Sequence, residues 1–336
     1  MDNGLKRKIQ TASNQNSLIL LTWLILGVTC QVVLYVVAMI FSYRIETDLL
    51  NQLYNLSAYI AQYVIAVPLA IIISKAVIKD GEAPKFRTAF RKPEATAGQL
   101  VRWLFICLFL IYGTALASQI LFSIIEKITG IELNSIDMTT DESLLSRITS
   151  VLSMMILAPL FEESMFRVTI VRNGTRFGNW GIIIISGITF GLWHCNYEQL
   201  FYAGVMGVCA GFLITKTKSV IPSLLLHFLM NTIGTVQSIG LGSIDQDKLN
   251  DMQYVMSNLG TVGMMVFASV LMYSSIIAGL ILFIIELTSH KDTFVLGEPD
   301  PESREVTKAY LTAPVTIVMF VVFIAATLFR GLFVSE

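Results

Sequence analysis

The chain has 336 residues, of which 54% are hydrophobic and only 14% are charged. Soluble domains carry about 25% charged residues, and the mean hydropathy of +0.69 also points away from an ordinary soluble protein. A net charge of −1 gives no basic excess, so we expect no nucleic-acid partner. The four cysteines show no CxxC spacing, which argues against a disulfide framework or a zinc knuckle.

Apolar runs dominate the chain. A helix of about 20 residues crosses roughly 30 Å of hydrocarbon. Nine candidate spans follow one another along the sequence: 18–43, 54–78, 101–125, 148–171, 180–197, 199–215, 219–240, 259–287 and 309–331. The fifth and sixth are short and almost contiguous, so they form either two short helices or one re-entrant pair. The pattern predicts an all-α, polytopic transmembrane helix bundle of about eight or nine spans, embedded in the lipid bilayer.

Loop charge alternates in sign between successive spans. Three loops are rich in Lys and Arg: 79–102, 172–176 and 216–218. Two other loops are rich in Asp and Glu: 126–142 and 245–251. Basic loops stay in the cytoplasm. The alternation therefore predicts a cytoplasmic N-terminus and, with nine spans, a C-terminus on the other side.

The fourth span carries charges that a membrane helix normally avoids. Glu162 and Glu163 stand in an apolar context, with Arg167 four residues after the second. Residues at i and i+4 share a helix face, so Glu163 and Arg167 can pair. Adjacent residues point about 100° apart, which leaves Glu162 without that partner. Pro159 removes a backbone hydrogen bond just upstream and favours a kink.

Two later spans carry the other polar groups. Phe190 and His194 lie in the fifth span, and His227 and Asn231 share a face of the seventh. At about 1.5 Å per residue from the inner ends of the spans, the depths are roughly 15 Å for Glu162, 21 Å for His194, 12 Å for His227 and 18 Å for Asn231. Ionisable groups inside a membrane indicate function, and this agreement in depth predicts one shared pocket.

Small residues accompany these motifs in the fifth and sixth spans. Gly187 and Gly191 form one GxxxG pair, and Gly207 and Gly211 form another. This spacing lets helix backbones approach closely. We interpret the glycines as packing positions that hold the pocket together rather than as chemical groups.

The three motifs resemble those of the CPBP family, which includes the CAAX proteases and bacteriocin-processing membrane enzymes. EExxxR stands here as Glu162-Glu163…Arg167, FxxxH as Phe190…His194, and HxxxN as His227…Asn231. The resemblance covers about residues 147–240. It implies a membrane endopeptidase whose substrate is a membrane-associated or lipidated peptide or protein, and it suggests a bacterial plasma membrane. Residues 1–146 and 241–336 then form flanking regions of three and two spans, and we interpret the loop 288–308 of the second region as a cytoplasmic linker.

Amide hydrolysis needs an activated water and a stabilised oxyanion. We assign Glu162 and His194 to the water, and His227 and Asn231 to the oxyanion. Glu163, Arg167 and Phe190 would support them. A metal variant is also open, in which Glu162, His194 and His227 hold zinc with water in the fourth position. Against it, there is no HExxH, and the ligands come from three helices.

Other functional classes fit parts of this pattern. A non-catalytic bacteriocin-immunity or peptide-binding membrane protein would use the same polar groups as a buried network. A proton-coupled transporter also places Glu and His within a membrane, but the chain shows no internal repeat of the kind common in transporters. Cys195 beside His194 makes a poor nucleophile, because a thiolate is disfavoured in apolar surroundings.

Overall fold

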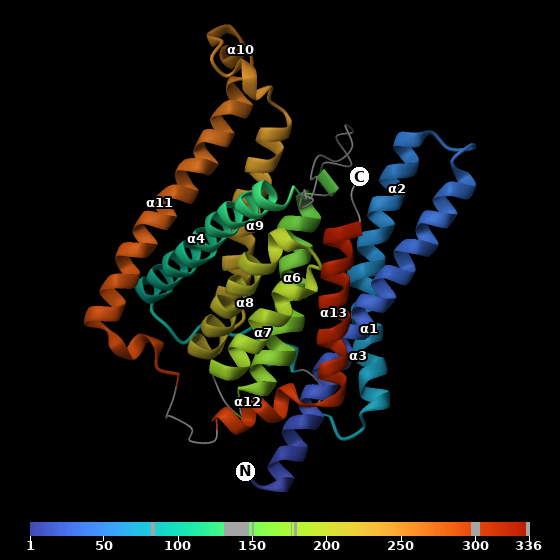
Figure 1. Cartoon of the computed structure of the whole chain (residues 1–336), viewed down its shortest axis with the longest axis vertical. Coiled ribbons are helices and arrows are strands. Elements are labelled where there is room, and N and C mark those ends of the chain that lie inside the picture. The colour runs from blue at the N-terminus through green and yellow to red at the C-terminus, as the bar shows by residue number, and fades with distance from the viewer. Residues whose placement is uncertain are drawn as a thin grey trace.

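The computed structural model describes residues 1–81, 85–130, 148–149, 151–175, 177, 180–296 and 303–333. Every regular element in these ranges is a helix, and the helices form an elongated bundle (Figure 1). Six described helices are long and apolar enough to cross a membrane, or seven when one bent pair counts as a span. The predicted polytopic helical bundle is therefore confirmed.

The helices follow the predicted spans with shifted ends. In chain order the longer elements are α1 (Asn3–Phe41), α2 (Thr47–Tyr59), α3 (Ala66–Val77), α4 (Ala97–Thr129), α6 (Ala158–Glu163), α7 (Trp180–Trp193), α8 (Tyr197–Thr217), α9 (Ile221–Gly242), α11 (Leu259–Ser289), α12 (Ser303–Leu311) and α13 (Pro314–Phe333). A short helix, α10 (Met252–Ser257), precedes α11. The proposed domain boundary near residue 146 lies outside the described residues.

Helix α1 begins at Asn3, fifteen residues before the start of the apolar span predicted at 18–43. Polar side chains of its second quarter are buried against the C-terminal helices. Ser13 Oγ donates a hydrogen bond to the Tyr310 carbonyl (2.7 Å), and Asn16 donates to the Tyr310 hydroxyl (2.9 Å). Ser17 bonds Thr316 at 2.8 Å. Tertiary partners thus satisfy polar groups that hydropathy alone assigns to a loop.

The ninth predicted span is two helices with a sharp bend. Helices α12 and α13 meet at 70° across a short break. Pro314 opens α13 and cannot donate a backbone hydrogen bond to the preceding turn, which explains why the helix does not run straight through. The predicted linker 288–308 was too long, because α12 already begins at Ser303.

The fifth and sixth predicted spans are two separate helices, α7 and α8, packed on each other through glycines. A Cβ added at Gly207 would lie 2.7 Å from the Gly187 Cα, and one added at Gly191 would run into the Leu200 carbonyl oxygen. The predicted close approach is therefore confirmed. Helix α7 ends at Trp193, four residues earlier than predicted, because Cys195 adopts a left-handed backbone (φ 51°) and Asn196 caps α8.

The predicted basic loops gather at one end of the bundle, together with the N-terminus (Figure 1). Backbone hydrogen bonds join Glu94 N to Thr217 O (2.8 Å) and Val220 N to Ala89 O (3.0 Å). The N-terminal amine pairs with Glu305 at 2.7 Å. The described part of the acidic segment 245–251 lies at the other end, beside α10. Arg176 and most of the loop 126–142 lie outside the described residues.

Candidate active site

The carboxylates lie on a helix of mixed winding. Two π-helical segments, η3 (Ser153–Leu157) and η4 (Ser164–Arg172), flank the single α-helical stretch α6 that ends in Glu162 and Glu163. Pro159 stands in the first turn of α6. Such π-helical turns widen a helix and occur frequently at functional sites. The kink predicted at Pro159 is realised as this change in winding.

Glu163 and Arg167 form a fully buried ion pair. Arg167 Nε donates to Glu163 Oε2 (2.9 Å) and Nη2 donates to Oε1 (3.3 Å), and both side chains are 0% exposed. Arg167 Nη1 also donates to the Ser186 hydroxyl of α7 (2.8 Å), and its guanidinium lies over the Phe190 ring at 5.0 Å. A bidentate pair of this kind fixes both side chains. The predicted i, i+4 pair is present in the structure.

Glu162 points away from Arg167, toward groups that can exchange protons or hydrogen bonds. The Tyr63 hydroxyl donates to Glu162 Oε1 at 3.4 Å, and His227 Nε2 lies 3.9 Å from Glu162 Oε2. The side chain is buried. The His227 separation is too long for a direct hydrogen bond, so a water or substrate atom between the two groups would be within reach of both.

His227 connects the two glutamates. Its Nδ1 lies 3.2 Å from Glu163 Oε1, while its Nε2 faces Glu162. Glu163 is a carboxylate that already accepts hydrogen bonds from Arg167, so His227 Nδ1 carries the proton and donates to Glu163 Oε1. A continuous chain of contacts therefore runs from Ser186 through the ion pair and the imidazole to Glu162.

His194 reaches the same site from the end of α7. Its Nδ1 donates to the Phe190 carbonyl at 2.8 Å, which leaves Nε2 with a lone pair. The Phe190 ring contacts both histidines edge-on, with ring centroids 4.9 Å from His194 and 5.8 Å from His227. Phe190 thus spaces the two imidazoles, while the carbonyl bond fixes the tautomer of His194.

Asn231 is oriented by the π-helical turn. Its Nδ2 donates to the Met154 carbonyl at 2.8 Å. In a π-helix each N–H bonds the carbonyl five residues earlier, as Ala158 does with Ser153. The next such donor would be residue 159, a proline with no N–H, so the Met154 carbonyl lacks its helical partner. Asn231 supplies the missing donor and joins α9 to η3.

The structure thus brings six of the predicted residues into one connected cluster, and Asn231 bonds the Met154 carbonyl beside it. Polar or ring contacts connect the following residues: Glu162, Glu163, Arg167, Phe190 and His227. His194 joins them through its contact with the Phe190 ring. Sequence reasoning missed Tyr63 and Ser186. A polar Gln-Tyr pair in the middle of an otherwise apolar second span was the available signal for Tyr63.

A zinc site needs three converging protein ligands. Within the described ranges, no group of three or more His, Cys, Asp or Glu side chains is arranged to hold a metal ion. The donor set in this conformation does not fit a three-ligand zinc centre, and we derive no step through a metal.

Comparison with known proteins identifies the segment that holds this site. Residues 144–233 match the family described as Type II CAAX prenyl endopeptidase Rce1-like. No curated protein and no solved structure matches the chain. The matched segment includes all three motif-bearing elements, and it excludes α1–α4 and α11–α13.

Proposed function

We propose that this chain, whose residues 144–233 match the Type II CAAX prenyl endopeptidase Rce1-like family, is an intramembrane protease of the CPBP/CAAX type. It would hydrolyse a peptide bond of a membrane-associated or lipidated protein or peptide, using a water activated by Glu162 and His194. The family match supports endopeptidase chemistry in the membrane. The assignment of individual residues rests on the geometry of the cluster.

The proposal rests on the different partners of the two adjacent glutamates. Glu163 is held by both Arg167 and His227. Glu162 is buried beside Tyr63 and His227, and no Lys or Arg of the described chain forms an ion pair with it. A general base must be free to take a proton, and of the two carboxylates only Glu162 meets that requirement.

The proposed reaction uses these groups in sequence. His194 accepts a hydrogen bond from the water at Nε2, and Glu162 removes the other proton as the water oxygen attacks the carbonyl carbon. The carbonyl oxygen becomes an oxyanion, which the second amide hydrogen of Asn231 and the Nε2–H of His227 stabilise by donating hydrogen bonds. Because Nδ1–H is already donated to Glu163, His227 takes this role as an imidazolium, with a proton on each ring nitrogen. Glu162 then passes its proton to the departing amine as the C–N bond breaks.

The test is cleavage of a lipidated or membrane-embedded peptide by purified protein in lipid nanodiscs, comparing wild type with Glu162→Gln. General acid–base catalysis contributes roughly 10²–10⁴-fold, so the variant should lose at least about a hundredfold in rate. Glu286→Gln is the matched control, because Glu286 is also a buried glutamate in a membrane helix. Equal cleavage by wild type and Glu162→Gln would rule out the proposed base.

Metal analysis of the same sample tests the zinc alternative. The water-activation mechanism predicts full activity without stoichiometric metal and no inhibition by chelators. If zinc were present at one per chain and were lost in His194→Ala and His227→Ala, the metal variant with Glu162, His194 and His227 as ligands would replace it.

A further inference from the structure

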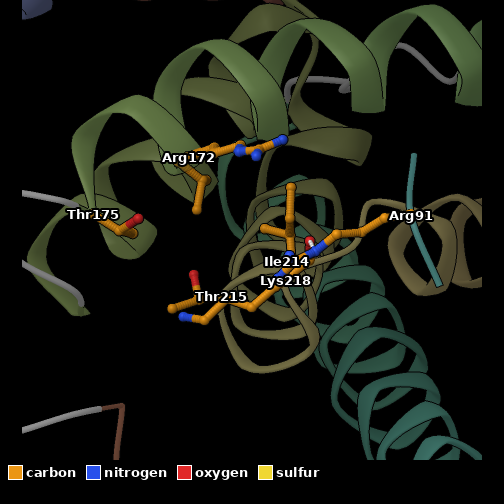
Figure 2. Close-up of a pocket in the computed structure, with 7 residues that line it drawn as sticks. Arg91, Arg172, Thr175, Ile214, Thr215 and Lys218 are labelled. Atoms are coloured by element: carbon orange, nitrogen blue, oxygen red, sulfur yellow. Dashed lines mark hydrogen bonds between the residues drawn. The ribbon is translucent and has the colours of Figure 1, made fainter. Parts of the chain in front are cut away.

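A cavity of about 120 Å³ lies at the end of the bundle that holds the basic loops, ten residues along the helix from Glu162. Its wall combines three separate parts of the chain, as Figure 2 shows: the end of η4, the end of α8 and the loop that precedes α4. The lining residues are Arg91, Val171, Arg172, Thr175, Ile214, Thr215 and Lys218.

Three of these seven side chains are cationic and none is acidic. Arg91 Nη2 pairs with Glu94 at 2.6 Å, but that exposed carboxylate is not part of the lining. Arg172 makes one long hydrogen bond, from Nη1 to the Lys85 carbonyl at 3.4 Å. In the described part of the chain no carboxylate forms an ion pair with Arg172 or Lys218. The cavity therefore concentrates positive charge without an internal counter-ion.

The wall is held in place by hydrogen bonds between segments distant in sequence. Arg91 Nε donates to the Lys218 carbonyl (2.9 Å), and Ser219 Oγ donates to the Arg91 carbonyl (2.6 Å). Two backbone hydrogen bonds, from Glu94 to Thr217 and from Val220 to Ala89, also join this loop to the end of α8 and the segment that follows it. The loop is thus fixed against α8, and the Arg91 side chain is already held at the pocket before a ligand arrives.

Two general effects place cations at this end of the molecule. Basic residues are favoured at helix C-termini, where η4 and α8 both end, and basic loops set membrane topology. Each effect accounts for a single Lys or Arg. Neither requires Arg91, Arg172 and Lys218 to converge on one concavity, where their mutual repulsion is unfavourable unless an anion is bound.

We propose that this pocket binds a phosphate group, carried either by the headgroup of an anionic lipid at that membrane face or by a soluble phosphate compound. A guanidinium presents a planar fork of N–H donors that matches phosphate oxygens, and Lys adds a compact point charge. The Thr175 and Thr215 hydroxyls line the same cavity (Figure 2). Binding here does not depend on the protease reaction.

The test measures binding to the purified full chain in detergent by native mass spectrometry. Phosphatidic acid is compared with phosphatidylcholine, and inorganic phosphate is added separately. The variants are Arg172→Gln in the pocket and Arg87→Gln as control. Arg87 is an exposed arginine at the same end of the bundle, in the loop that carries Arg91, and it does not line the cavity. A third variant, Arg172→Lys, retains the positive charge but lacks the planar N–H donors of the guanidinium. Thermal melting of each variant without ligand establishes that it is folded.

We expect one phosphatidic acid per chain in preference to phosphatidylcholine. Losing a charge-assisted hydrogen bond should weaken binding by roughly tenfold or more in Arg172→Gln, less in Arg172→Lys, and by under about twofold in Arg87→Gln. If inorganic phosphate alone binds with this variant pattern, the ligand is a soluble phosphate and the pocket assignment holds. If neither ligand binds, or if Arg87→Gln weakens binding as much as Arg172→Gln, the proposal is wrong.

Discussion

Tyr63 is the side chain that ties the N-terminal helices to the catalytic cluster. It lies in the π-helical segment η1 (Ile60–Ile65) between α2 and α3, and its hydroxyl donates to Glu162 Oε1. Its ring stacks on Phe161 with centroids 5.3 Å apart. One hydrogen bond therefore acts on the proposed base from outside the segment that matches the protease family.

Removing this hydroxyl should lower turnover without much change in substrate binding. We expect Tyr63→Phe to reduce kcat by roughly five- to tenfold, since a hydrogen bond to a charged group contributes about 1.5–3 kcal/mol at best and this one is long. KM should stay near the wild-type value, because the bond positions the base rather than the substrate.

Tyr112→Phe provides the matched comparison for Tyr63→Phe. Tyr112 is a buried tyrosine of α4 whose hydroxyl has no hydrogen-bond partner among the described residues. Its loss should leave kcat unchanged. Indistinguishable kcat values for the two variants in the nanodisc cleavage assay would remove Tyr63 from the site.

At the scale of the helical element, Pro159 and Asn231 form one structural unit. The proline removes a backbone donor, and the amide of Asn231 supplies it to the Met154 carbonyl. Leaving a buried carbonyl without a partner costs about 1–3 kcal/mol. The side chain proposed to face the oxyanion is thus also part of the helix architecture.

A double-mutant cycle separates these roles. Asn231→Ala should lower stability by about 1–3 kcal/mol in the wild-type background and by distinctly less in Pro159→Ala, where an N–H at residue 159 can bond Met154. Cleavage should fall in both backgrounds, because the oxyanion donor is missing in each. Additive stability effects, measured by denaturant unfolding in mixed micelles, would contradict the assigned coupling.

The α7–α8 pair depends on glycine for close contact. An added Cβ at Gly207 would meet the Gly187 backbone at 2.7 Å, whereas at Gly234 of α9 it would meet nothing within 4 Å. We expect Gly207→Ala to destabilise the protein by about 1–3 kcal/mol through overpacking. Gly234→Ala should be neutral or should stabilise by about 0.5–1 kcal/mol, since alanine favours the helix. Thermal unfolding of both variants tests the difference, and equal melting temperatures would show that the contact is not tight.

These elements also show what could be predicted from sequence. The ion pair of Glu163 with Arg167 and the glycine packing follow from helical spacing, which depends only on local geometry. The bond from Tyr63 to Glu162 spans 99 positions and depends on how two helices cross, which no local period encodes. The π-helical winding around Pro159 could not be predicted from local sequence either. It is accompanied by the hydrogen bond from Asn231 to Met154, which is a contact between two helices.

At the scale of the whole molecule, charge separates the two ends of the bundle. The loop before α4 and the C-terminal end of α8 lie at the end that carries the N-terminus, and the segment 245–251 beside α10 lies at the opposite end (Figure 1). The Lys248 ammonium, 2.7 Å from Asp245, lowers the pKa of that exposed carboxyl, so the carboxyl stays ionised to a lower pH than usual and is negative at neutral pH. Positive loops are retained in the cytoplasm during insertion. The bundle should therefore insert with its N-terminal end inside.

Site-directed labelling of intact cells measures that orientation. In a background with the four native cysteines replaced by alanine, Asp247→Cys and Arg87→Cys each place one thiol at an exposed loop position. A membrane-impermeant maleimide should label Asp247→Cys on intact cells and Arg87→Cys only after permeabilisation. The reverse pattern would place the basic end outside. Because the phosphate pocket lies at the basic end, the same result decides which leaflet, cytoplasmic or outer, could supply its lipid.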